Sequence, residues 1–180
     1  IEQATSFFKE IVEADIAVLS GDARGIDAAS HRPALKYGGL TGAILGSGLN
    51  VVYPPEHLSL FDSIVEMGGV VISEFPCHRL PRPSYFPRRN RIVSGLSSVV
   101  LVVEAARRSG ALITARIAVE EHGRQCFAVP GRVGDRASAS CIQTIRDGWV
   151  GIAVHPSEVI EEAINSWARL SNVNRNATRR

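Results

Sequence analysis

The sequence has few of the features that mark metalloproteins, secreted proteins and membrane proteins. Its three cysteines, Cys77, Cys126 and Cys141, show neither a CxxC spacing nor a histidine pattern typical of a zinc site. We therefore expect free thiols, a reducing compartment and no bound metal. No apolar run approaches the roughly 20 residues of a membrane helix, and the first residues do not resemble a signal peptide. These absences favour a cytoplasmic protein without a membrane partner.

Lysine is also nearly missing, because only two of the 20 basic residues are lysine and the rest are arginine. The planar guanidinium group suits phosphate and can stack on bases, whereas the lysine ammonium is a point charge. The formal net charge is only +2, but the charge is segregated. Residues 75–103 contain no Asp or Glu, and five arginines lie there: Arg79, Arg82, Arg88, Arg89 and Arg91. So many cations without a nearby carboxylate indicate an external anionic partner.

Apolar runs alternate with helical patterns along the chain, which predicts an α/β fold. The run at 99–103 is continuous and mostly β-branched, as in a strand buried on both faces of a parallel sheet. Right-handed crossovers would give a doubly wound, mostly parallel sheet of the Rossmann-like kind. One domain is expected at 1–168, with a disordered tail at 169–180. Strands are expected near 16–19, 42–45, 70–73, 99–103, 125–129 and 152–154, and helices near 26–37, 55–67, 111–122, 141–147 and 157–168.

The loops that follow the strands of such a sheet emerge at one edge, where ligands bind. SGDARGID at 20–27 and GSG at 46–48 are candidate phosphate loops, through Ser20, Gly21, Gly46, Ser47 and Gly48. A purely structural turn is the alternative for both. Neither GxGxxG nor GxxxxGK[ST] occurs, so a dinucleotide cofactor and P-loop hydrolysis have no support. We expect no cofactor.

The segment FPRRNR at 86–91 is expected to form a basic turn that leads toward the strand at 99–103. After that strand, Ser109 is expected to cap the helix at 111–122. Glu74 and Glu104 each end a strand at the binding edge. They could form an acid–base pair or bind a metal, but we expect them to orient the neighbouring arginines.

The segments SGDARGIDAASH, GAILGSGLNVVYPPEH, GGVVISEFP, FPRRNRIVSGLS and VVLVVEAARRSGALITARIAVEEHGR, in this order, resemble the DNA-processing protein A family (DprA, also called Smf). The resemblance covers about residues 16–162. It implies an extended Rossmann-like fold that binds single-stranded DNA without catalysis, protects incoming DNA during natural transformation and helps load a RecA-type recombinase, usually as a homodimer. With the residue pattern, it gives the candidate DNA-binding set Arg24, Gly25, Arg82, Arg88, Arg89, Asn90, Arg91, Ser109, Gly110 and Thr114.

The sequence departs from the family pattern in the first loop and before Ile1. Asp22 stands where the family usually has an uncharged residue, and a carboxylate there would repel a phosphate. The family's first strand, which ends in a Gly-Ser/Thr-Arg turn, is absent before Ile1. We therefore expect a fragment of a longer protein with one pocket wall missing.

Two alternatives to a DNA-binding protein stay open. A related Rossmann-like family could supply a carrier for a phosphorylated nucleoside or a phosphoribohydrolase-like enzyme. Such enzymes carry PGGxGTxxE, whereas this sequence reads EAARRSGALITARIAVE. A degenerate family member could instead act only as a recombinase adaptor. We expect a protein that is not an enzyme.

Overall fold

Strands and helices alternate along the chain in the computed structural model, which describes residues 2–21, 23–106 and 109–177. The helices are α1 (Glu2–Glu13), α2 (Ile26–Tyr37), the 3-10 helix η1 (Pro55–His57), α3 (Leu58–Glu66), α4 (Tyr85–Leu96), α5 (Gly110–Glu120), α6 (Ala139–Arg146) and α7 (Pro156–Ala177). The strands are β1 (Val18–Ser20), β2 (Thr41–Ile44), β3 (Val70–Ile72), β4 (Val99–Val102), β5 (Gln125–Ala128) and β6 (Gly151–Ile152). Each expected strand is present within about two residues of its predicted place.

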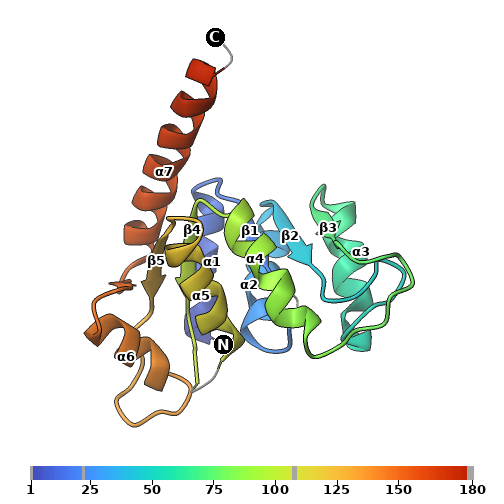
Figure 1. Cartoon of the computed structure of the whole chain (residues 1–180), viewed down its shortest axis with the longest axis horizontal. Coiled ribbons are helices and arrows are strands. Elements are labelled where there is room, and N and C mark those ends of the chain that lie inside the picture. The colour runs from blue at the N-terminus through green and yellow to red at the C-terminus, as the bar shows by residue number, and fades with distance from the viewer. Residues whose placement is uncertain (1, 22, 107–108, 178–180) are drawn as a thin grey trace.

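The described strands form two parallel sheets of three strands each, in the orders β1-β2-β3 and β4-β5-β6 (Figure 1). Val18 is paired with Thr41 in the first sheet, and Val100 with Cys126 in the second. The parallel, doubly wound arrangement expected from the sequence is confirmed. The expectation of one continuous sheet is corrected, because β1 and β4 are each an edge strand that no described strand joins.

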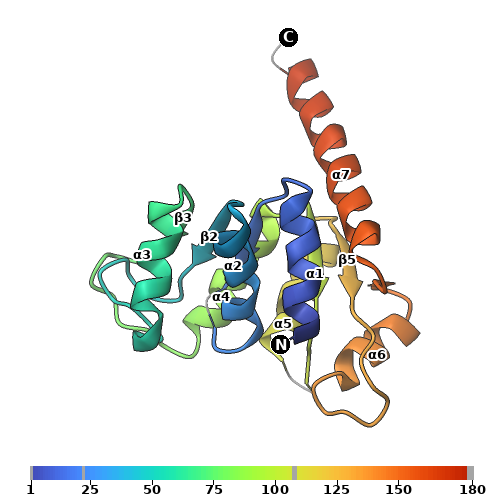
Figure 2. The same cartoon turned by 180° about the vertical axis from the view of Figure 1, so that it is seen from behind.

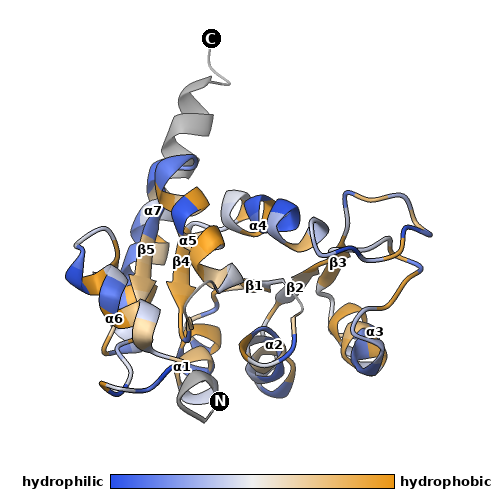
Figure 3. Ribbon diagram, turned by 60° about the horizontal axis from the view of Figure 1, so that its bottom comes forward, coloured by the Kyte–Doolittle hydropathy of each residue, from blue (hydrophilic) through white to orange (hydrophobic). Residues whose placement is uncertain are grey.

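Helices cover both faces of the strands. Figure 3 shows α4 and α5 on one side and α2 and α3 on the other, and Figure 2 shows α1 beside α2. The apolar stripe of α1, formed by Phe7, Phe8, Ile11 and Val12, is buried against the sheets and α7. Alternate core residues of β4 pack against α5 and α6 in a second cluster. The helical spacing of these four residues puts them on one buried face of α1.

The basic segment at 86–91 is not a turn, as the sequence suggested, but part of helix α4. Pro87 lies in the first helical turn, where its missing N–H group has no helical acceptor to lose. The helix lacks a clear apolar stripe of its own, and contacts with α5, β1 and β2 hold it in place. Tertiary packing thus outweighs a sequence pattern that did not indicate a helix.

The region expected to be a tail from residue 169 continues α7 as far as Ala177. Figure 1 shows this helix projecting away from the body of the molecule. Arg169 forms an ion pair with Glu162, and the Ser166 hydroxyl donates to the same carboxylate at 2.7 Å. These contacts lie at the end of the part of α7 that was expected to be helical, 157–168, and the helix continues beyond them.

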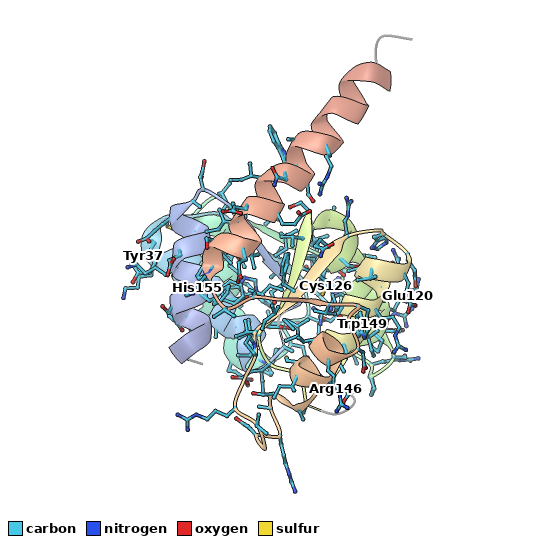
Figure 4. The ribbon with its side chains drawn as sticks, turned by 90° about the vertical axis from the view of Figure 1, so that its left-hand side faces the viewer. Tyr37, Glu120, Cys126, Arg146, Trp149 and His155 are labelled. Atoms are coloured by element: carbon cyan, nitrogen blue, oxygen red, sulfur yellow. The ribbon has the colours of Figure 1, made fainter. Side chains whose placement is uncertain are left out.

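None of the described helices has the length and apolar character needed to cross a bilayer. Cys126 and Cys141 are buried and Cys77 is exposed, and all three are free thiols. Burial raises the pKa of Cys126 to about 12, so this thiol stays protonated at neutral pH. Figure 4 shows Cys126 in the interior, while Tyr37, Glu120 and Arg146 lie at the periphery.

Candidate nucleic-acid interface

A cavity of about 1330 Å³ is lined by β1 and β4 and by the residues that follow the carboxyl ends of both strands. It brings together many of the residues predicted from the sequence: Ser20, Gly21, Arg24, Gly25, Arg89, Asn90, Ser109, Gly110 and Thr114. Other predicted residues lie outside its lining, namely Arg82, Arg88, Arg91, Gly46, Ser47 and Gly48. The sequence-derived set therefore divides into a cavity group and a peripheral group.

The loop after β1 leads into the N-terminal end of α2 at this cavity. Gly25 has φ 91°, a left-handed conformation that strains other residues, and it immediately precedes the helix. The Ala23 N–H group donates to the Asp27 carboxylate at 2.9 Å, so the loop already satisfies one of its own amides. The positive end of the helix dipole faces the cavity, which favours an anion there. Asp22 lies outside the described residues, and its predicted repulsion of phosphate stays a prediction.

Arg89 is a buried residue, with only 3% of its surface exposed. Its guanidinium group donates to the Ile44 carbonyl at the end of β2 and lies 5.9 Å from the centre of the Phe86 ring. A Cβ atom at Gly21 would lie 2.5 Å from the guanidinium carbon, so glycine allows the two to touch. We therefore interpret Arg89 as a residue that positions the loop after β1, whereas the sequence presented it as an equal of the exposed Arg88.

The loop at 46–48 is packed inside the protein. Ser47 is 1% exposed, and its hydroxyl donates to the Val51 carbonyl at 2.8 Å. The Gly48 N–H group donates to the Arg79 carbonyl at 2.8 Å, and a Cβ atom at Gly48 would lie 2.1 Å from the Pro76 carbonyl oxygen. The Ser47 hydroxyl and the Gly48 N–H group, which could donate to a phosphate, are therefore already bonded within the protein. The structure thus corrects the interpretation of this loop as a phosphate cradle and supports the structural alternative.

Arg24 reaches the cavity but is held by a carboxylate. Its guanidinium group donates two hydrogen bonds to Glu56, at 2.6 and 3.2 Å, and both side chains are more than half exposed. The hydrogen bond to Glu56 raises the pKa of Arg24, and the same bond lowers the pKa of Glu56. The sequence gave no sign of this pair, because 32 positions separate the two residues and Glu56 lies in η1.

Glu74 organises the arginines on the exposed side of α4. Its carboxylate forms ion pairs with Arg91 and, at 3.4 Å, with Arg88. The sequence-based interpretation that Glu74 orients neighbouring arginines is confirmed. The inference that these cations lack a local partner was wrong, because Glu74 lies one position before the acid-free segment. Two guanidinium groups share one carboxylate, however, and the arginine side chains are 62% and 49% exposed, so a net positive charge faces solvent.

Aromatic rings support this arginine cluster. The rings of Phe75 and Tyr85 stack with centroids 4.3 Å apart. Arg88 lies 5.7 Å from the Phe75 ring centre, and Arg82 lies 6.0 Å from that of Tyr85. The two rings are therefore stacked on each other, and each has one guanidinium group near it, as cation–π attraction favours.

The N-terminal end of α5 lines the same cavity as the N-terminal end of α2. The Ser109 hydroxyl accepts a hydrogen bond from the Ala111 N–H group at 3.2 Å, which confirms the expected helix cap. The Asn90 side chain and the Thr114 hydroxyl both donate to the Gly110 carbonyl, at 3.2 and 3.3 Å. Asn90 thus ties α4 to α5, and both the α2 and α5 N-terminal ends face the same cavity.

The sequence model of the family described as DNA recombination-mediator protein A matches residues 1–164. The chain belongs to this family. Protein Smf of Escherichia coli is 45% identical over 155 residues, which are 86% of this chain and 41% of that protein. The DNA processing protein DprA of Streptococcus pneumoniae is 44% identical over 137 residues, 76% of this chain and 48% of that protein. The chain thus spans less than half the length of these DprA/Smf relatives.

Solved structures confirm the Rossmann-like fold of the DprA family for this chain. The crystal structure of the S. pneumoniae DprA superimposes with a TM-score of 0.80 at 37% identity, over 91% of this chain and 58% of that one. A DprA of Helicobacter pylori, studied for its single-stranded DNA binding mode, gives 0.79 at 22% identity, over 91% and 73% of the two chains. A molybdenum cofactor binding protein of Rippkaea orientalis gives 0.59 at 20% identity and shares the fold alone.

Proposed function

We propose that this chain is the single-stranded DNA-binding core of a DprA/Smf protein. The observation that carries the proposal is the meeting of two helix N-terminal ends, those of α2 and α5, with Arg24 at one cavity. Helix N-terminal ends attract phosphate oxygens through their unpaired N–H groups and their dipole. The names of the relatives and the DNA binding of the H. pylori protein support the same ligand.

The DNA backbone would continue from the cavity onto the exposed face of α4. Arg88 and Arg91 carry more positive charge than Glu74 neutralises, and Arg82 lies beside them over Tyr85. Arginine contacts with phosphates do not depend on the base, and an aromatic ring can stack on the face of any base. A protein reads sequence only through the edges of the bases. We therefore expect binding with little sequence preference and strong dependence on salt.

The cellular role we propose follows from the family. The full protein would protect incoming DNA in the cytoplasm during natural transformation and load a RecA-type recombinase, as a homodimer. We also propose that it catalyses no reaction, because two arginines engage the Glu74 carboxylate, which a general acid or base would need to be available to a substrate. The phosphoribohydrolase-like alternative predicts release of free base from nucleoside monophosphates. No such release is expected, and base release that Glu104→Gln abolishes would replace this proposal.

The test of DNA binding is a fluorescence-anisotropy titration with single- and double-stranded oligonucleotides of several sequences at 50 and 200 mM salt. We expect preference for single strands, similar affinity for all sequences and weaker binding at higher salt. Arg88→Ala should flatten the dependence of affinity on salt for all sequences, while Arg132→Ala, an exposed arginine outside the cavity lining, serves as the control. Salt-insensitive or strongly base-selective binding would contradict the proposal.

A further inference from the structure

Tyr53 lies beside the cavity and is not in the candidate set that the sequence gave. It belongs to the segment between β2 and η1. The ring of Phe86 and the guanidinium group of Arg24 both contact its side chain, and both of these residues line the cavity. Tyr53 itself is 37% exposed. An aromatic side chain thus stays partly open to solvent at the edge of the candidate DNA site.

The side chain of Tyr53 is held at two points. Its ring centroid lies 5.6 Å from that of Phe86, with the two planes inclined at 43°. The Arg24 guanidinium group, whose pKa is raised mainly by Glu56, also forms a hydrogen bond with the Tyr53 side chain that adds to this rise. A side chain that is fixed before binding loses little rotational freedom when a ligand packs against it. The ring of Tyr53 is therefore preorganised.

The surroundings of Tyr53 are fixed as well. The Phe86 ring lies against Gly46, just after β2, where a Cβ atom would be 2.8 Å from the ring. The Asn50 N–H group, in the segment that leads to Tyr53, donates to the Cys77 carbonyl at 2.9 Å. These contacts tie the segment to β2 and to the loop before α4, so the ring keeps its place without a ligand.

Tyr53 differs from the other two tyrosines in how it meets a cation. Tyr37 has two lysine ammonium groups over its ring, at 5.1 and 5.5 Å from the centre, and Tyr85 has the Arg82 guanidinium group at 6.0 Å. Tyr53 instead contacts Arg24 through a hydrogen bond. A cation that is bound at the hydroxyl leaves the faces of the ring available to other planar groups.

We propose that Tyr53 stacks on the base of the nucleotide whose phosphate contacts Arg24. The proposal rests on the proposed DNA-binding function and adds a contact with a base to the contacts with phosphates. The phosphate and the base belong to one nucleotide, and their two protein partners are hydrogen-bonded neighbours. Stacking on an aromatic ring accepts any of the four bases, so this contact adds affinity without sequence preference.

The test compares two ligands in the anisotropy assay: labelled oligothymidylate, and a labelled chain of the same length in which abasic units replace the nucleotides. Tyr53→Leu should weaken binding of oligothymidylate by at least about fivefold, because one stacked base is lost. Its binding of the abasic chain and its salt slope should not change, because no phosphate contact is removed. The matched control is Tyr37→Leu, at the end of α2 remote from the Arg24 loop and 41% exposed (Figure 4), which should bind both ligands as the parent does.

Tyr53→Phe separates stacking from a role in holding Arg24. This variant keeps the ring and removes the hydroxyl, so it should bind oligothymidylate as the parent does. An equal loss of affinity in Tyr53→Phe and Tyr53→Leu would overturn the proposal in favour of a positioning role toward Arg24. A loss that is equal for oligothymidylate and the abasic chain would overturn it as well.

Ultraviolet cross-linking of the unaltered protein to an oligonucleotide that carries 5-iodouracil gives a second test that does not depend on how a variant folds. Mass spectrometry should find cross-links at Tyr53, and their absence while the oligonucleotide is bound would overturn the proposal. Absence of any binding by the parent protein would overturn both this proposal and the DNA-binding function. Binding that Tyr53→Leu does not change would overturn the stacking proposal alone.

Discussion

Replacing Glu56 by glutamine should strengthen DNA binding. In the structure the guanidinium group of Arg24, which lines the cavity, donates two hydrogen bonds to Glu56. A phosphate that binds there must compete with this carboxylate for the same donors. The Glu56→Gln variant keeps the size of the side chain and removes its charge, so Arg24 becomes available to the DNA backbone.

The expected magnitude follows from counterion release. Each additional phosphate contact on single-stranded DNA steepens the plot of log affinity against log salt by about 0.7. One freed arginine should therefore change the ratio of variant to parent affinity by about 2.6-fold between 200 and 50 mM salt, with the larger gain at 50 mM. Arg24 holds the pKa of Glu56 below its ordinary value, so the pair persists at neutral pH and substitution is needed to release it.

The assay is anisotropy with one labelled oligonucleotide at four salt concentrations. The matched control is Glu66→Gln, which removes the same charge from an exposed position at the end of α3. A general loss of negative charge affects both variants alike, so only the difference between them reports on Arg24. Equal slopes for Glu56→Gln and Glu66→Gln would refute the placement of Arg24 against a phosphate.

Three further predictions concern single substitutions of residues that the structure describes. Arg88→Ala should weaken DNA binding and flatten the salt slope by about 0.7 without changing stability. Arg89→Ala should instead lower the free energy of unfolding by about 1.5–3 kcal/mol, because it removes the buried bond to Ile44. Urea denaturation separates the two variants, and equal stabilities would contradict the distinction. Burial lowers the pKa of His31 to about 4, against about 6.5 unfolded, so its contribution to stability is complete above pH 6.5 and is lost as the pH falls toward 4, by about 3 kcal/mol. His31→Gln should lose this part of the pH dependence, and parallel stability curves for the two proteins would argue against it. Gly48→Ala should lower stability by about 1–3 kcal/mol, because its Cβ atom would overlap the Pro76 carbonyl; an unchanged melting temperature would count against the packed loop.

The local patterns of the sequence were sufficient for the strands and most helices. The apolar run that contains β4 has no polar face, so it can form only a strand covered on both sides. Gly38 and Gly123, with φ of 74° and 58°, directly follow the expected helix ranges 26–37 and 111–122, as is typical of glycine at helix ends. The cap of α5 by Ser109 could be predicted because the hydroxyl and the N–H group that it accepts from are only two residues apart in the chain.

What the sequence could not supply were contacts between distant segments. Arg88 and Arg89 carry the same sequence signal, yet one faces solvent and the other is buried against Gly21, because only the packing of α4 decides which side of the helix is covered. Likewise the Arg24–Glu56 pair depends on how η1 lies beside the loop after β1, and no spacing in the sequence encodes that.

The sequence by itself determined the α/β order, the family and the concentration of glycine, arginine and hydroxyl residues in loops at one edge. Those properties depend on side-chain polarity and backbone preference over a few neighbouring residues. Only the tertiary structure decided which arginines are available to a ligand, which glycine loop is filled by protein, and that residues of β1 and β4 line the same cavity. These outcomes depend on burial and on paired charges, which arise when segments far apart in the chain come into contact.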